Sequence, residues 1–283
     1  MIGLRSAGFH LASAPIKRTW AWLVLACVLA GCAAVGDSSL SIPPLNVAGA
    51  RKPSNPLTAT LILPPGPGPF PAVIVLHGCG GLSSSRMADW SSRLNSWGYA
   101  AVILDSFGPR GVDTVCDPSA QHLVTPADRA GDVLSTAVYL RSLPRIDGNR
   151  IGVLGLSHGG TTAAWVTQRR YATVFPGLLR ASVDYYGPCR SPETYGDVPL
   201  LALAGDADDW GNSALTCHAF AAKLPQGAPF EVHTYPDTYH AFDNARSTAR
   251  KVEGHVLAYN HDAAEDSFVR THAFLDRYMA VGR

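Results

Sequence analysis

The chain has 283 residues, of which 47% are hydrophobic and 16% charged, and its 23 basic residues nearly balance its 22 acidic ones. A chain so close to neutrality lacks the basic surface that nucleic acid binding requires, so we expect no nucleic-acid partner. Residues 57–283 are enough for one domain with a substantial hydrophobic core.

The first residues have the features of an exported protein. Residues 20–30 form an apolar segment that follows three basic residues. The segment is too short to span a bilayer, which takes about 20 residues, and it ends in small residues, which favours a secretory signal. Residues 29–32, Leu-Ala-Gly-Cys, resemble the bacterial lipobox, in which the cysteine is acylated and becomes the new N-terminus.

We therefore expect a signal peptide at residues 1–31 and lipidation of Cys32, which would anchor an exported lipoprotein in the membrane. The residue after Cys32 is not aspartate, and this favours the outer membrane, facing the periplasm or the cell surface. An ordinary signal peptide cleaved near Ala33 or Ala34 is the alternative. Residues 32–56 are rich in serine, proline, glycine and alanine, and we expect a flexible tether there.

Four cysteines follow the expected anchor, and an even number in an exported chain favours disulfides over free thiols. Four cysteines allow three pairings, and the sequence does not choose among them. We favour the two pairs that would each link loops on one edge of the expected sheet. They are Cys79–Cys116 and Cys189–Cys217. We expect no metal site, because the chain has neither a C-x-x-C nor an H-E-x-x-H motif.

Short apolar runs alternate with helical patterns through the rest of the chain. The expected strands are residues 58–63, 72–77, 100–104, 151–156, 181–186, 199–204 and 230–235. The expected helices are residues 85–97, 126–143, 158–169, 213–223 and 263–279. Strands that alternate with helices predict an α/β fold: a mostly parallel, doubly wound sheet with helices on both faces. Continuously apolar strands are typical of such a covered sheet.

Residues 155–159, Gly-Leu-Ser-His-Gly, lie between an expected strand and an expected helix. A strand, a G-x-S-x-G turn and a helix together make a nucleophile elbow, which exposes the serine hydroxyl on a tight turn. The two glycines are needed because side chains there would collide with the neighbouring elements. We therefore expect Ser157 to be a nucleophile, although an idle serine in a glycine-rich turn is the alternative.

A serine nucleophile needs a base, and the base needs an acid that orients it. Asp208 follows a strand at its carboxyl end, where such a fold places its site. We expect Asp208 to be the acid, with Asp209 as the alternative. His240 lies just beyond the last expected strand and is the expected base. Of the alternatives, His233 lies inside that strand, His218 and His272 lie on expected helices, and His255 and His261 lie in an irregular stretch.

The oxyanion that forms during acyl transfer needs two backbone N–H donors. One would come from His158, which follows the nucleophile. The other would come from Cys79, in the glycine-rich segment at residues 77–81. A turn that merely caps the next helix is the alternative for this segment.

With these residues in place, the chain resembles the dienelactone hydrolase family of α/β-hydrolases from about Leu57 onward. The segments that carry the resemblance are residues 77–81, 105–111, 147–160, 205–210 and 235–242. The resemblance implies a hydrolase that works without a cofactor. The eponymous members have a cysteine where this chain has Ser157, and an arginine that binds the substrate carboxylate where this chain has Asn244.

These departures argue against dienelactone hydrolysis and favour a serine hydrolase of small or polymer-end carboxylic esters, acting through an acyl-enzyme. A peptidase or acyltransferase on the same triad is the first alternative. A non-catalytic binding protein of the cell envelope is the second. The sequence leaves the oligomeric state open.

Overall fold

The computed structural model describes residues 1–3, 8, 37–190 and 195–280. It divides the chain into two units, Met1–Ala34 and Val35–Arg283, and the second contains the described helices and strands. Most of the expected signal peptide, together with Cys32, lies outside the described residues. Among the residues that the structure describes, no helix is both long enough and apolar enough to cross a membrane.

An eight-stranded sheet in the order β1-β2-β4-β3-β5-β6-β7-β8 forms the centre of the second unit. The strands are β1 (Ser38–Ile42), β2 (Leu57–Ile62), β3 (Phe70–Leu76), β4 (Ala100–Asp105), β5 (Ile146–Leu156), β6 (Ala181–Tyr185), β7 (Leu200–Gly205) and β8 (Phe230–Tyr235). Strands β3 to β8 run parallel, whereas β1 and β2 pair antiparallel at one edge. All seven expected strands are present, and the expected α/β fold is confirmed.

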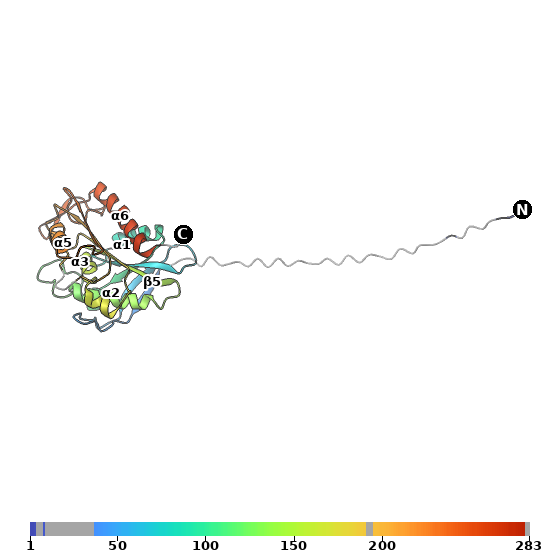
Figure 1. Ribbon diagram of the computed structural model, residues 1–283, viewed down its shortest axis with the longest axis horizontal. Helices are drawn as coiled ribbons and strands as arrows, with labels where there is room; N and C mark the ends of the chain where they lie inside the picture. Colours follow the sequence, from blue (N-terminus) through green and yellow to red (C-terminus); the bar gives the residue numbers. More distant parts are fainter. Residues whose placement is uncertain (4–7, 9–36, 191–194, 281–283) are drawn as a thin grey trace. The chain divides into compact units, whose positions relative to one another are not determined.

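Helices cover both faces of this sheet. They are α1 (Ser84–Ser96), α2 (Pro126–Leu140), α3 (His158–Trp165), α4 (Arg169–Val174), α5 (Ser213–Ala221) and α6 (His261–Met279), with a 3-10 turn at Gly108–Arg110. Figure 1 shows α1 and α6 on one side of the sheet and α2 on the other. Strand β3 serves both cores, because Ile74 packs with the α2 and α3 side while Val75 packs with the α1 and α6 side.

Helix α2 begins where its sequence predicts. Thr125 accepts a hydrogen bond from the Asp128 N–H, and the Asp128 carboxylate accepts one from the Thr125 N–H. This reciprocal capping satisfies two N–H groups that the first turn would otherwise leave free. Helix α3 ends earlier than expected, because Gln168 has an extended backbone and forms an isolated bridge with Tyr195.

The tether that we expected at residues 32–56 is wrong for the part that the structure describes. Residues Ser38–Ile42 form strand β1, which pairs with β2, and the Ile42 side chain is fully buried. The chain after β1 is fixed to α2, since Leu45 N–H donates to Ser135 Oγ at 3.0 Å and Arg51 N–H donates to Asp128 at 2.7 Å. The folded unit thus begins well before residue 57.

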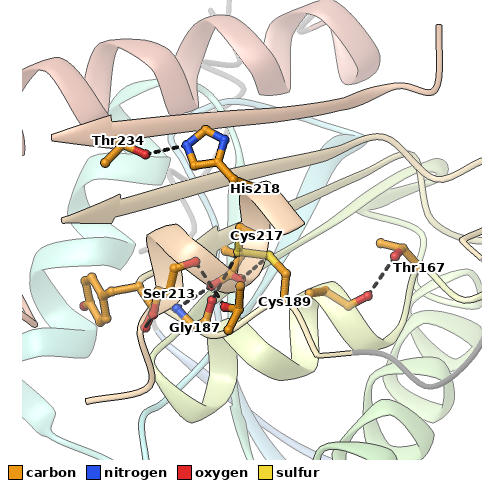
Figure 2. Close-up of a disulfide and its surroundings, with 11 residues drawn as sticks. Thr167, Gly187, Cys189, Ser213, Cys217, His218 and Thr234 are labelled. Carbon is orange, nitrogen blue, oxygen red and sulfur yellow. Dashed lines mark hydrogen bonds between the residues drawn. A yellow bond between two sulfur atoms is a disulfide. The ribbon is translucent and has the colours of Figure 1, made fainter. Parts of the chain in front are cut away.

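Both expected disulfides are present. Cys79 pairs with Cys116 at a Cα–Cα distance of 4.8 Å, and Cys189 pairs with Cys217 at 4.7 Å. Figure 2 shows the second pair, in which α5 carries Cys217. A hairpin of β9 (Arg250–Val252) and β10 (His255–Leu257) was not expected from the sequence, because three-residue strands are too short to show a periodic pattern.

Candidate active site

Ser157 occupies the sharp turn between β5 and α3. Its φ of 57° and ψ of −116° form a strained conformation that a non-glycine residue rarely adopts. A Cβ on Gly155 would lie 1.9 Å from the carbonyl oxygen of Gly159, and one on Gly159 would lie 2.5 Å from that of Leu76. Both glycines are therefore required by close backbone approach, and the turn has the geometry of a nucleophile elbow.

The structure brings Ser157, His240 and Asp208 into one hydrogen-bonded chain. His240 Nε2 lies 2.9 Å from Ser157 Oγ, and His240 Nδ1 lies 2.8 Å from Asp208 Oδ2. An ionised carboxylate only accepts hydrogen bonds, so the Nδ1–H donates to Asp208 and Nε2 is left to accept the serine proton. Asp208 and His240 are 2% and 3% exposed. The Trp210 N–H also donates to Asp208, at 2.9 Å.

The other acids and histidines lie elsewhere. Asp209 contacts His255 at 3.1 Å, and the Asp206 side chain is exposed. The other candidate bases that follow Asp208 also have partners outside the site: His218 with Thr234, His233 with Asp266, His261 with Asp262, and His272 with Trp97. The geometry therefore favours Asp208 over Asp209 as the partner of His240.

The segment with Cys79 lies against the elbow. A Cβ on Gly78 would contact Ser157 Cβ at 3.6 Å. The Cys79 carbonyl accepts from the Val115 N–H at 2.8 Å, and the disulfide to Cys116 joins the same two segments. Among the described hydrogen bonds, the N–H groups of Cys79 and His158 have no acceptor. Both are thus available as oxyanion donors.

A pocket of about 280 Å³ opens over these groups. Its lining includes Cys79, Ser157, His158, Trp165, Arg190 and Trp210. The Trp210 ring also packs against His240, with centroids 5.1 Å apart. The pocket is thus apolar and aromatic around a few polar groups, as is usual for sites that bind small molecules.

Two groups next to the site were not found from the sequence. Tyr186 packs edge-on against the His240 ring at 4.7 Å, and its hydroxyl donates to Asp243 at 2.8 Å. Arg129 lies fully buried behind His158. Neither residue belongs to a local sequence motif. A charged residue on a helix is usually solvated, and Arg129 is buried only because α2 packs against the elbow.

The region beside the second disulfide is not a metal centre. Asp184, Cys189 and Cys217 bring one carboxylate and two sulfurs within 4.8 Å of one another. The sulfurs are bonded to each other, so neither is the thiolate that a metal would need. Burial raises the pKa of Asp184 well above its usual range, despite a hydrogen bond from the Gly187 N–H.

Comparison with known proteins places this chain in a family. Among curated proteins, acyl-coenzyme A thioesterase 2 of Mus musculus is 35% identical over 36% of this chain and 20% of its own length. A probable 2-oxo-3-(5-oxofuran-2-ylidene)propanoate lactonase of Bradyrhizobium sp is 26% identical over 62% of this chain and 74% of its own. The chain therefore spans only a fifth of the thioesterase.

Among solved structures, a putative dienelactone hydrolase from Klebsiella pneumoniae superposes with a TM-score of 0.66. It is 22% identical and covers 86% of this chain and 98% of its own, so the likeness shows a shared fold. The model of the dienelactone hydrolase family matches residues 57–279, from strand β2 to the end of α6. The chain belongs to the dienelactone hydrolase family and has the α/β-hydrolase fold.

Proposed function

We propose that this protein is a serine hydrolase that cleaves carboxylic esters through an acyl-enzyme intermediate. The observation that carries the proposal is the chain of hydrogen bonds from Ser157 Oγ through His240 to Asp208. A serine in a strained elbow, a histidine within hydrogen-bond reach and a buried acid behind it together provide what nucleophilic acyl transfer needs. Family membership supports hydrolysis as the reaction class.

In the first half of the reaction, Ser157 Oγ attacks the ester carbonyl carbon while its proton moves to His240 Nε2. The carbonyl oxygen becomes an oxyanion, which accepts hydrogen bonds from the Cys79 and His158 N–H groups. The bond to the alcohol oxygen then breaks, and His240 gives its proton to the leaving alcohol. Asp208 stabilises the imidazolium in between.

In the second half, water attacks the acyl-enzyme and gives a proton to His240. The tetrahedral intermediate collapses, the acid leaves, and the proton returns to Ser157. A pocket of about 280 Å³ is at the small end for ligand sites, which favours short or polymer-end esters. Thioesters share the same acyl chemistry, and the relative named as a thioesterase supports including them among the substrates tested.

A panel of p-nitrophenyl esters, thioesters and peptides tests this function. We expect short esters to be hydrolysed and Ser157→Ala to lose at least about 1000-fold in kcat/KM. Ser119→Ala is the matched control, because Ser119 is an exposed serine whose hydroxyl donates to Asp117. Turnover of peptides without esters would make the protein a peptidase. Failure of a fluorophosphonate to label Ser157 would favour the non-catalytic alternative.

We also propose that the protein is an exported lipoprotein acylated at Cys32. Two disulfides in the folded unit support an oxidising compartment. Metabolic labelling with a radioactive fatty acid tests the anchor. We expect incorporation in the native chain and none in Cys32→Ser, whereas an unlabelled native chain would favour ordinary cleavage by a signal peptidase.

A further inference from the structure

Arg129, on the first turn of α2, is a charged side chain in an unusual setting. It is fully buried, and it forms no ion pair with any carboxylate that the structure describes. The nearest acids on its helix are already engaged, since Asp128 binds Arg51 and Asp132 binds Arg110 through two hydrogen bonds of 2.7 and 2.9 Å. The charges of Asp132 and Asp105 act on Arg129 only from a distance, and burying a charge without a direct ion pair is costly, so this position demands an explanation beyond stability.

The guanidinium of Arg129 joins the two segments that carry the oxyanion donors. One terminal nitrogen lies 2.8 Å from His158 Nδ1, and the other donates to the carbonyl oxygen of His77 at 2.8 Å. His158 directly follows the nucleophile. His77 stands two residues before Cys79. One rigid, planar group therefore spans the elbow and the oxyanion segment from behind.

This contact also fixes the protonation of His158. A guanidinium only donates hydrogen bonds, so His158 Nδ1 accepts and the ring proton sits on Nε2. Burial, reinforced by the neighbouring charge of Arg129, lowers the pKa of His158 to about 3. The negative charge of Asp128 acts on this pKa in the opposite direction, with a smaller effect. The imidazole is thus a neutral ring held in one tautomer.

We propose that Arg129 is a positioning residue for the oxyanion hole. By holding His77 and His158, it keeps the Cys79 and His158 N–H groups directed at one point. Its charge, shielded from water, also favours the negatively charged tetrahedral intermediate over the neutral ester. Burial lowers the pKa of Arg129 to about 9, which leaves it charged at neutral pH. This inference rests on the proposed ester hydrolysis.

Kinetics of two substitutions separate this role from a merely structural one. Removing one oxyanion donor costs about 100-fold or more in kcat, and we expect a loss of that order for Arg129→Met with KM changed less than about threefold. Arg129→Lys keeps the charge but loses the two-point contact, so it should recover part of the loss. Arg51→Met, which breaks an ion pair to the same helix, should leave kcat unchanged. The concentration of active sites is measured by titration with a fluorophosphonate, so that unfolded protein does not lower the apparent kcat.

A spectroscopic measurement on the native protein provides a second test. Nitrogen-15 NMR of histidine-labelled protein should show His158 protonated at Nε2 alone and not titrating between pH 5 and 8; its resonance is assigned by its loss in His158→Asn. A His158 ring that is protonated at Nδ1, or that titrates in this range, would overturn the inference.

The two proposals fail in different ways. Native protein that hydrolyses no ester would overturn the proposed function. Ester hydrolysis that depends on Ser157 but proceeds at full kcat in Arg129→Met would overturn only the role of Arg129.

Discussion

Gly205 lies so close to Thr238 that a Cβ on the glycine would be 1.9 Å from the Thr238 carbonyl oxygen. The Ala207 N–H also donates to this oxygen, at 3.2 Å. The loops that carry Asp208 and His240 therefore pack backbone against backbone. The side chains of Asp208 and His240 meet because this backbone packing fixes the two loops. Substituting Asp208 or Asp209 in the first loop therefore tests which acid serves His240.

Asp208→Asn should reduce kcat for ester hydrolysis by about 10³–10⁴-fold, with the fold retained. An amide nitrogen can donate to His240 Nδ1, which favours the tautomer that cannot take the serine proton. Asp209→Asn is the matched control, because that side chain is exposed and contacts His255 instead. Steady-state kinetics on one p-nitrophenyl ester measure both. A larger loss of kcat in Asp209→Asn than in Asp208→Asn would mean that Asp209, and not Asp208, is the acid.

The elbow offers a test of packing that does not depend on activity. Gly159→Ala would place a Cβ 2.5 Å from the Leu76 carbonyl oxygen, so one of the two backbone segments would have to shift. We expect the free energy of unfolding to fall by about 3 kcal/mol, as for overpacked cores. Gly80→Ala is the control, because its Cβ would meet only Cys116 Sγ at 3.9 Å. Urea unfolding followed by tryptophan fluorescence compares the two, and equal stability would show that the elbow tolerates a side chain.

Much of this site could be predicted from the sequence because its geometry depends on local backbone constraints. The glycines around Ser157 show where a strand meets a helix, and the ends of parallel strands meet at one edge. Asp208 and His240 could then be chosen by their position after a strand. The same reasoning located both disulfides, since each links loops at that edge.

What could not be predicted depends on contacts between distant segments. Strand β1 is short and half exposed, and its sequence has too few apolar residues to distinguish it from a linker. Its burial comes from pairing with β2 and packing against α2. Arg129 is similar: its sequence position predicts a solvated helix surface, and only the docking of α2 behind His158 removes it from water.

The buried histidines predict how stability depends on pH. The pKa of His158 is lowered to about 3, and that of His77 is lowered well below its usual range, in both cases mainly by burial. Below pH 6.5 the unfolded chain binds protons at these positions that the folded chain does not. The part of the free energy of unfolding that these two histidines contribute should therefore fall as the pH drops from 6.5 towards 4, whereas Asp184 and Asp132, whose pKa values burial raises, contribute in the opposite direction.

Urea unfolding at a series of pH values measures this slope. Compared with the native protein, His158→Asn should lose less stability as the pH drops, because the asparagine does not titrate, and its carbonyl can still accept from Arg129. His261→Asn removes an exposed histidine that pairs with Asp262 and should leave the slope as in the native protein. A slope that His158→Asn does not change would contradict a neutral, buried His158.

The edge strand predicts that the folded unit needs residues before Leu57. Ile42 is fully buried and pairs with Leu57 across the β1–β2 ladder. Truncating such a side chain leaves a cavity, so Ile42→Ala should lower the free energy of unfolding by about 2–5 kcal/mol. Ser41→Ala, on the exposed face of the same strand, should change it by less than about 0.5 kcal/mol. Chemical denaturation measures the free energy of unfolding of the two variants. If Ile42→Ala is as stable as Ser41→Ala, residues 38–42 act as a tether, and the folded unit does not depend on β1.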